Sequence, residues 1–240
     1  PGQFMEEWLA LYKSKSGERG IFNRVAARKG IERNMQHRGK EDRQRETEHN
    51  FGTNPCSEII LRDCEFCNLT EMVVRADDTR ESLMRKARLA TILGTWQSTL
   101  TDFRYLSSSW KKNCEDERLL GVSMTGIMDC EITNGKEAGL ETLLSDLRKE
   151  VVEVNRKFAK NIGVEQSVAT TCVKPSGTVS QLVDAASGIH ARHNPYYIRT
   201  VRADNKDPLC TFMKSKGFPH EACVMKPDNV TVFSFPIKAP

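Results

Sequence analysis

Long segments with a helical spacing of apolar residues alternate along this chain with short runs rich in β-branched residues. The clearest helical segment covers residues 138–161, carries one apolar stripe and has Gly163 as its expected stop. A short strand is expected over residues 167–173, where Pro175 follows. Alternation of this kind predicts an α/β architecture with a partly parallel sheet.

The remaining pattern predicts further helices and strands. Helices are expected over residues 4–13, 79–110, 178–186 and 209–216, and the run 119–128 is compatible with a second buried helix. A strand is expected over residues 196–201, and residues 230–237 form a strand-like run. The highly charged segment 28–50 is expected to be a solvated surface loop or a surface helix.

Composition excludes several classes of protein. Thirty-six basic and 32 acidic residues leave a net charge of +4, which is no signature of a nucleic-acid-binding protein. No apolar run reaches the length of a membrane span, and residues 1–8 have no signal-peptide pattern. Eight cysteines in 240 residues are too few for a secreted disulfide scaffold and indicate free thiols in the cytoplasm. Because the chain starts at Pro1 and stops at Pro240 inside a strand-like run, we expect a fragment of a longer protein.

A constrained loop over residues 52–59 carries three chemically useful side chains. Asn54, Cys56 and Glu58 are spaced so that they point to one side if the segment is extended. A thiol can lose a hydrogen atom, a carboxylate can accept a proton, and an amide can hold a hydroxyl group. The residues alone leave a structural interpretation open, because a lone cysteine is often buried and an Asn-Pro pair often forms a turn.

A second group of thiols follows shortly afterwards. Cys64 and Cys67 form a C-x-x-C motif that fits half of a zinc site, a redox pair or two unrelated thiols. No second cysteine or histidine pair follows at the spacing of a zinc site, so we expect no metal centre. His190 and His193 receive no role from the sequence.

A loop rich in Gly, Ser and Thr follows the expected strand 167–173 and opens a helix. Backbone N–H groups at a helix start suit a phosphate, although the residues alone favour an ordinary capped helix. Lys174, at its start, is expected to be solvated. The candidate phosphate-binding residues are Ser176, Gly177, Thr178, Val179 and Ser180.

Taken together, these motifs resemble ribonucleotide reductases. The loop with Asn54, Cys56 and Glu58, followed by Cys67, is similar to the finger loop of that family. Segments 14–24, 91–103 and 174–182 extend the resemblance over almost the whole chain. The similarity is greatest to the adenosylcobalamin-dependent, class II, monomeric ribonucleoside-triphosphate reductases.

The resemblance implies a role for each residue of the loop. Cys56 would carry a thiyl radical and remove the 3′ hydrogen of the ribose. Glu58 would take the proton of the 3′ hydroxyl, and Asn54 would hydrogen-bond the sugar. Cys67 would be one of two reducing thiols, and its partner in the family lies upstream of Pro1. The loop 176–180 would hold the substrate phosphates.

The resemblance also implies the whole protein. Residues 1–240 would form the C-terminal portion of a ten-stranded α/β barrel, incomplete at both ends, with 28–50 as a charged surface loop. The intact protein would reduce ribonucleoside triphosphates for DNA synthesis as a monomer, with adenosylcobalamin, a thioredoxin-type reductant and a deoxynucleotide effector bound outside this segment. The isolated segment would be inactive and poorly soluble. Alternatives are a class I-type large chain that takes its radical from a partner subunit, a non-catalytic nucleotide-binding protein and a zinc-binding module.

Overall fold

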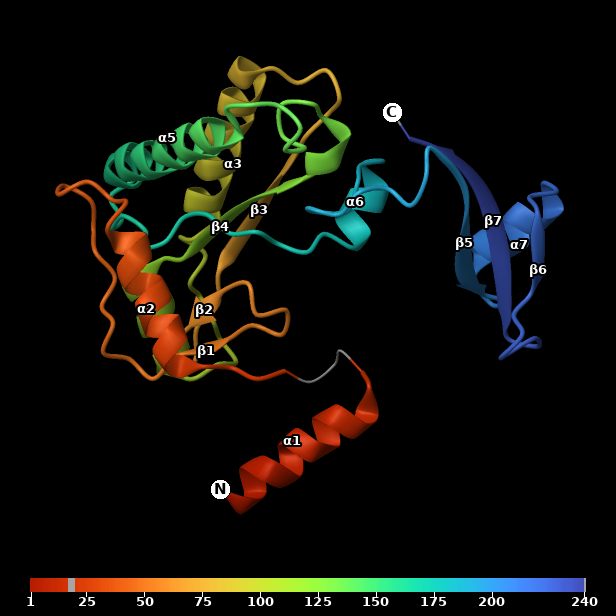
Figure 1. The fold of residues 1–240 in the computed structure, drawn as a ribbon, viewed down its shortest axis with the longest axis horizontal. Coiled ribbons are helices and arrows are strands. Elements are labelled where there is room, and N and C mark those ends of the chain that lie inside the picture. Colours follow the sequence, from red (N-terminus) through yellow and green to blue (C-terminus); the bar gives the residue numbers. More distant parts are fainter. Residues whose placement is uncertain (17–19, 240) are drawn as a thin grey trace. The chain divides into compact units, whose positions relative to one another are not determined.

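The computed structural model of the chain describes residues 1–16 and 20–239 and divides it into two compact units. Unit 1 combines Pro1–Met72, Glu81–Ser123 and Glu141–Lys174, and unit 2 contains the remaining segments. Figure 1 labels the helices and strands of both units. The segment 14–24 of the sequence motif falls partly on residues 17–19, which lie outside the described residues.

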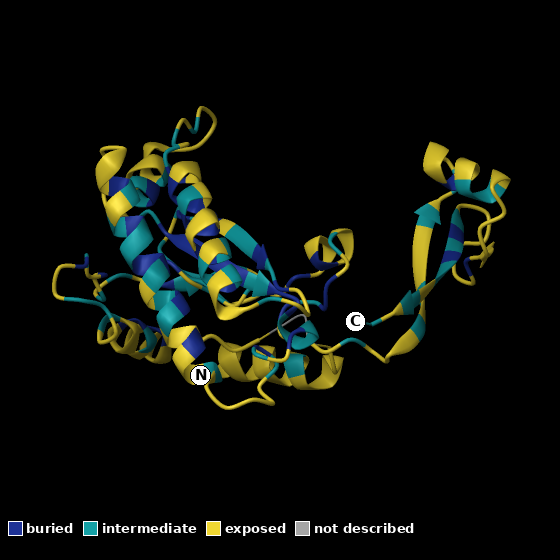
Figure 2. Ribbon diagram, turned by 90° about the horizontal axis from the view of Figure 1, so that it is seen from above, coloured by how far each residue is buried: buried dark blue, intermediate teal, exposed yellow. Residues whose placement is uncertain are grey.

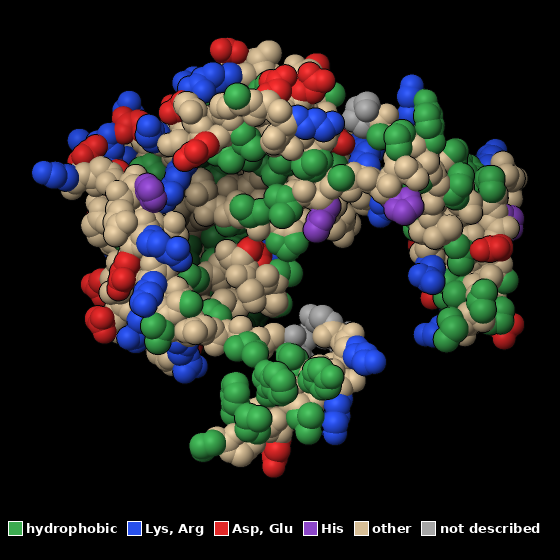
Figure 3. All heavy atoms as spheres, viewed as in Figure 1, with side chains coloured by type: hydrophobic (Ala, Val, Ile, Leu, Met, Phe, Trp, Pro, Cys, Tyr) green, Lys and Arg blue, Asp and Glu red, His purple; other side chains and the backbone are tan. Residues whose placement is uncertain are grey.

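Helices make up much of unit 1, and two of them agree closely with the sequence. These are α1 (Gly2–Ser14), expected over residues 4–13, and α5 (Leu140–Asn161), expected over residues 138–161. Gly163, two residues beyond α5, has φ 74°, the left-handed conformation expected of a helix stop. The apolar side chains of α1 are exposed and gather on one face, as Figure 3 shows.

The predicted single helix over residues 79–110 is wrong. The structure has two helices there, α3 (Arg80–Gln97) and α4 (Ser108–Glu117), with an irregular connection between them. The hydroxyl of Ser98 donates to the carbonyl of Thr95 at 2.6 Å, and that of Thr99 donates to Trp96 at 2.8 Å. Such side-chain bonds compete with helical backbone bonds, and they occur where the helix ends.

The run 119–128, which was compatible with a buried helix, contains a strand instead. Strand β4 (Leu120–Thr125) pairs with β3 (Asn68–Val73) and is buried on both faces. A strand that is buried on both faces reads as a continuous apolar run, so its periodicity does not distinguish it from a helix. Gly126 follows with φ 80°, which ends the strand.

The sheet around β4 is parallel, as the sequence predicted. The N–H of Asn68 donates to the carbonyl of Leu119, and the N–H of Val74 to that of Thr125, both at 2.8 Å, so β3 and β4 run in the same direction. The expected strand 167–173 is an extended segment that forms only a single parallel bridge, between Val122 and Thr171. The predicted α/β class is therefore confirmed.

A buried asparagine connects the main helices of unit 1 to the segment after β4. The amide of Asn155 in α5 donates to Thr95 Oγ1 at 2.9 Å and to Ser167 Oγ at 3.1 Å, and its carbonyl oxygen accepts from the Ser167 N–H. Both helices have buried and exposed residues, and the helices in Figure 2 show this mixture of dark blue and yellow. This network holds the start of the extended segment 167–173 against both helices.

The charged segment 28–50 is not one surface loop. Its first residues belong to α2 (Arg24–Met35), in which Ala27 and Ile31 are buried. Further on, Arg45 is buried as well, and its Nε donates to Glu117 Oε2 at 3.0 Å. A guanidinium can be buried when a carboxylate pairs with it, which charge composition alone does not reveal.

Unit 2 contains an antiparallel sheet in the order β5-β7-β6. The sequence predicted most of its elements, namely β5 (Tyr196–Asp204), β7 (Val230–Lys238) and α7 (Pro208–Ser215), whereas the short β6 (His220–Ala222) was not foreseen. Its other helices are the 3-10 turn η1 (Ile127–Asp129) and α6 (Thr178–Leu182). Helix α6 is shorter than the predicted 178–186, because Asp184 adopts a left-handed conformation with φ 48°. Across the described ranges, no helix is long and apolar enough to cross a membrane.

Candidate functional site

The loop with Asn54, Cys56 and Glu58 is a hairpin turn and not an extended segment. It joins β1 (Gly52–Thr53) to β2 (Ile60–Leu61), which pair antiparallel. The N–H of Ser57 donates to the carbonyl of Asn54 at 2.9 Å, which closes a tight turn around Pro55 and Cys56. The expected alternation of side chains is therefore wrong, and the turn itself arranges the three residues.

Within this turn, Asn54 and Glu58 lie together and Cys56 lies at the tip. Asn54 Oδ1 accepts a hydrogen bond from the N–H of Ile59 at 3.1 Å, and Asn54 is one of the groups that lower the pKa of Glu58. The Cys56 side chain is exposed. A thiol at an exposed tip is accessible to a reactant outside unit 1, whereas the neighbouring carboxylate is enclosed.

Glu58 forms an ion pair with Lys174. Its Oε1 lies 2.6 Å from Lys174 Nζ, and its side chain is only 7% exposed. Burial alone would raise the pKa of Glu58, but hydrogen bonds from Lys174, its own backbone and Asn54 outweigh burial and lower it. Glu58 is therefore an ionised carboxylate at neutral pH.

Cys67 shares a small cavity with this carboxylate. The cavity measures about 100 Å³, and Glu58, Cys67 and Cys172 are among its lining residues. Burial raises the pKa of the Cys67 thiol, so Cys67 is protonated at neutral pH. Glu58 Oε2 is buried and has no hydrogen-bond partner within the described part of the chain. The site thus combines an unpartnered carboxylate oxygen with a protonated thiol.

Two residues of this cavity region were not recognised from the sequence. Lys174 was expected to be solvated, but it pairs with Glu58. Cys172 was not considered, yet its Sγ and that of Cys67 each lie 3.0 Å from the position that a Cβ on Gly121 would occupy. Cys172 belongs to the extended segment 167–173 and Lys174 follows it directly, and the expectation of a strand there was the available signal.

The candidate phosphate loop lies in unit 2 and has its own hydrogen-bond network. Ser180 Oγ donates to the carbonyls of Ser176 and Gly177 at 2.9 Å, and the Ser180 N–H donates to Ser176 Oγ at 3.2 Å. Ser176 and Ser180 are buried, while Gly177, Thr178 and Val179 are exposed. The two serines therefore shape the loop, and the three exposed residues form its accessible surface.

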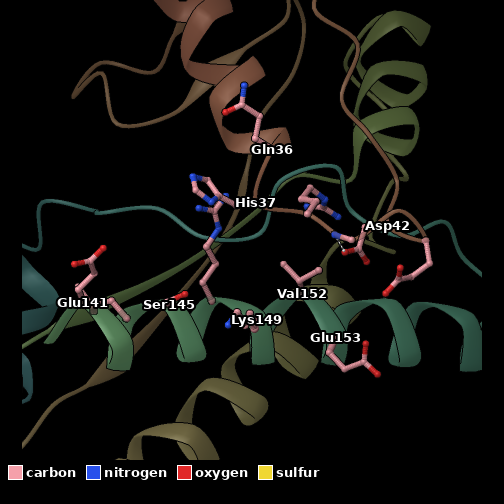
Figure 4. A pocket seen from close by; sticks show the side chains of 13 residues that line it. Gln36, His37, Asp42, Glu141, Ser145, Lys149, Val152 and Glu153 are labelled. Carbon is pink, nitrogen blue, oxygen red and sulfur yellow. Dashed lines mark hydrogen bonds between the residues drawn. The ribbon is translucent and has the colours of Figure 1, made fainter. Parts of the chain in front are cut away.

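A larger cavity of unit 1 contains none of the predicted site residues. It measures about 700 Å³ and lies between the end of α2 and α5, where Figure 4 shows His37, Asp42, Lys149 and Glu153 among its lining residues. Its charges are of both signs, as they are over the surface in Figure 3. No cluster of three or more metal-ligating side chains occurs in residues 1–16 and 20–239, so the zinc-binding alternative has no support from the geometry.

Comparison with known proteins gives a consistent result. No family model matches the chain. It is 30% identical over 213 residues to the adenosylcobalamin-dependent ribonucleoside-triphosphate reductase of Lactobacillus leichmannii, which covers 78% of this chain and 28% of that protein. It is also 30% identical over 192 residues to the enzyme of that name from Euglena gracilis, covering 79% of this chain and 25% of the relative.

A solved structure agrees with these sequence matches. The crystal structure of a B-12 dependent (class II) ribonucleotide reductase superposes with a TM-score of 0.65 at 30% identity, over 78% of this chain and 29% of the other. The chain belongs to the class II ribonucleotide reductase family. This ribonucleotide reductase chain spans less than a third of the length of the relatives from Lactobacillus leichmannii and Euglena gracilis. The family that its motifs predicted is confirmed.

Proposed function

We propose that the intact protein containing this chain reduces ribonucleotides to deoxyribonucleotides with a thiyl radical on Cys56. The observation that carries this proposal is the position of Glu58, which belongs to the same turn as Cys56 and faces the same cavity as Cys67. One hairpin thus brings a hydrogen-atom carrier, a base and a reducing thiol into one region. Relatives with this activity in their names support the proposal.

Each of these residues has a distinct task in the proposed reaction. The Cys56 radical removes the 3′ hydrogen atom of the ribose, and Glu58 Oε2 accepts the proton of the 3′ hydroxyl. Asn54 holds the sugar by a hydrogen bond. The 2′ hydroxyl leaves as water, and Cys67 and a second thiol outside this chain supply two electrons and form a disulfide. Cys56 finally returns a hydrogen atom to C3′ of the product radical, which regenerates its thiyl radical.

Adenosylcobalamin fits the exposed position of Cys56. When bound, this cofactor supplies the radical that abstracts the hydrogen atom of the thiol. The Cys56 side chain lies at the tip of the turn and is exposed, so a large group can approach it from outside unit 1. The relatives are named adenosylcobalamin-dependent, and no observation favours a partner subunit as the source of the radical.

The loop Ser176–Ser180 is proposed to hold the substrate phosphates. Its exposed backbone at Gly177, Thr178 and Val179 offers N–H donors, and the Thr178 hydroxyl adds another. Ser176 and Ser180 keep the backbone in this shape through their internal hydrogen bonds. The names of the relatives favour ribonucleoside triphosphates as substrates.

The remaining proposals concern the whole protein. We place the chain in the second half of a ten-stranded α/β barrel, since β3, β4 and the segment 167–173 give part of a parallel sheet. The intact protein is proposed to act as a monomer in the cytoplasm, with a thioredoxin-type reductant and a deoxynucleotide effector that binds outside this chain.

The proposal is tested by nucleotide reduction in the intact protein with and without adenosylcobalamin, beside a Cys56→Ser variant. We expect cobalamin-dependent turnover in the wild type and a loss of at least about 10³-fold in the variant, because a hydroxyl group cannot replace the radical-bearing thiol. Turnover without cobalamin would contradict the class II assignment and leave the role of Cys56 standing.

The matched control is Cys64→Ser. Cys64 belongs to the same stretch of chain but takes no part in the cavity shared by Glu58 and Cys67, so this variant should keep its activity. Activity that survives in Cys56→Ser would show that this thiol does not carry the radical.

A further inference from the structure

The ion pair between Lys174 and Glu58 makes the two oxygens of the carboxylate different. Oε1 lies 2.6 Å from Lys174 Nζ, while Oε2 is buried without a hydrogen-bond partner among the described residues. The Lys174 side chain is 27% exposed and that of Glu58 is 7% exposed. One oxygen is therefore paired with a cation, and the hydrogen-bonding capacity of the other is unused.

Lys174 is held in place by the sheet. Its backbone N–H donates to Ser123 Oγ at 3.0 Å, and Ser123 is buried in β4. Two residues earlier, the N–H of Cys172 donates to the carbonyl of Val122. These bonds fix the backbone of Lys174 at the end of the extended segment, so the ammonium group is presented to the hairpin turn by a rigid element.

The pair also controls the charge of Glu58. Burial opposes ionisation of this carboxylate, and the largest opposing effect is the hydrogen bond from Lys174, which lowers the pKa of Glu58. The same hydrogen bond raises the pKa of Lys174, so both groups are charged at neutral pH. Without the ammonium group, burial would dominate and the carboxylate would bind a proton more readily.

We propose that Lys174 is a positioning residue for the base of the reaction. It keeps Glu58 ionised and occupies Oε1, so that Oε2 is the atom that takes the proton of the ribose 3′ hydroxyl. The proton moves from the hydroxyl oxygen to Oε2, Glu58 becomes neutral, and the Lys174 ammonium keeps its three protons throughout. This role rests on the proposed function, in which Glu58 is the base.

The test uses Lys174→Met in the intact protein, with adenosylcobalamin and ribonucleotide substrate, over pH 5.5 to about 9. In the wild type, Glu58 has a pKa below 4.5, so kcat/KM should change little through its ionisation in this range. In Lys174→Met, the acidic limb of the pH profile of kcat/KM should move to higher pH. The value of kcat/KM at pH 6 should then lie below that at pH 8.5, by about tenfold for each unit by which the pKa of Glu58 exceeds 6. Lys174→Arg should restore the wild-type profile, because it keeps the positive charge.

A matched control distinguishes this role from the loss of any lysine pair. Lys157 pairs with Glu153 at 2.9 Å on the exposed surface of α5, so Lys157→Met should leave the pH profile unchanged. A Lys174→Met profile that superposes on the wild type would overturn the proposal, whatever the absolute rate of the variant.

A second readout needs no turnover. The carboxyl carbon of Glu58, labelled with ¹³C and assigned by its absence in Glu58→Gln, is titrated by NMR in the wild type and in Lys174→Met. We expect titration below pH 4.5 in the wild type and at higher pH in the variant. A wild-type midpoint above 4.5 refutes the inference even if Lys174→Met does not fold. If the titration behaves as expected but the wild type reduces no ribonucleotide, the proposed function fails and the coupling of Lys174 to Glu58 stands.

Discussion

At position 121 the sheet has no room for a side chain. A Cβ on Gly121 would lie 3.0 Å from both Cys67 Sγ and Cys172 Sγ, and 2.6 Å from a methyl carbon of Leu69. The leucine methyl can rotate away, whereas the two short cysteine side chains have little freedom. The glycine therefore leaves the space beside which both thiols lie.

Replacing Gly121 by alanine should therefore destabilise the protein. We expect Gly121→Ala to lower the free energy of unfolding by about 1–3 kcal/mol, because overpacking forces the neighbouring side chains to shift. The measurement is the midpoint of chemical unfolding, together with the rate at which Cys67 reacts with a thiol reagent.

Gly94 in α3 provides the control for this substitution. A Cβ there would have only ordinary contacts, of 3.4 Å to Thr70 and 3.5 Å to Leu120, and alanine is the better helix former. Gly94→Ala should be neutral or stabilising. Equal unfolding midpoints for Gly121→Ala and the wild type would show that the sheet adapts freely around the thiols.

Single residues also show how far sequence reasoning reaches. The identity of Asn54, Cys56, Glu58 and Cys67 was readable because their spacing forms a motif. The partners of those residues were not, because the contact of Lys174 with Glu58 joins positions 116 apart in the chain. Such a contact depends on how the segment 167–173 pairs with β4, and no local pattern encodes that pairing.

At the scale of elements, a buried charge cluster connects the segment 28–50 to α4 and to the turn after β2. Arg45 pairs with Glu117 of α4, and its Nη2 lies 3.7 Å from Glu65 Oε2. Glu65 Oε2 also accepts the N–H of Arg62 at 2.8 Å. Burial, and then the negative charge of Glu117, raise the pKa of Glu65 to about 8. One guanidinium thus faces two carboxylates, and one of them, Glu65, is neutral below about pH 8.

The cluster makes stability depend on pH. Since the pKa of Glu65 in the folded protein lies above its ordinary value near 4.5, its ionisation opposes folding more strongly as pH rises from about 4.5 to about 8. Glu65→Gln removes this ionisation and keeps an oxygen that can accept the Arg62 N–H. The variant should therefore unfold at a higher temperature than the wild type at pH 9, with a smaller difference at pH 5, as measured by thermal unfolding at both pH values.

The opposite behaviour is expected of a surface carboxylate. Hydrogen bonds from Lys157 and Arg156 lower the pKa of Glu153, so Glu153→Gln should give no gain in stability at pH 9. If Glu65→Gln is no more stable than the wild type at pH 9, Glu65 is not the group that opposes folding there.

Elements were predictable where the apolar pattern has a clear period. Helix α5 carries a stripe that only a helix buries on one side, and the sequence placed it within two residues at its start. Strand β4 is buried on both faces, so its sequence is an uninterrupted apolar run. Such a run lacks the alternation of apolar and polar residues that marks a strand, and a helix was compatible with it. The error at 79–110 is of another kind, because α3 ends at Gln97 although the apolar spacing continues beyond it.

At the scale of the whole molecule, the proposed reaction needs groups that residues 1–240 do not supply. The proposed chemistry consumes two thiols for each ribose, and the chain supplies Cys67, whose neighbour across Gly121 is Cys172. Burial raises the pKa of Cys172 to about 11, so this thiol is protonated at neutral pH, as Cys67 is. The strand β4 separates the backbone of Cys67 from that of Cys172, whereas a disulfide needs Cα atoms within about 7 Å. Cys172 is therefore a weak substitute for a reducing partner.

The 240-residue chain alone should consequently give no multiple turnover, even with adenosylcobalamin, substrate and a dithiol reductant present. The chain spans about 28% of the length of the relative from Lactobacillus leichmannii, and the resemblance places the second reducing thiol in the part of the enzyme that precedes it. The measurement compares deoxyribonucleotide formation by the isolated chain and by the intact protein under the same conditions. Sustained turnover by the isolated chain that disappears in Cys172→Ser would mean that Cys67 and Cys172 form the redox pair, and the sheet around Gly121 would then have to move in each cycle.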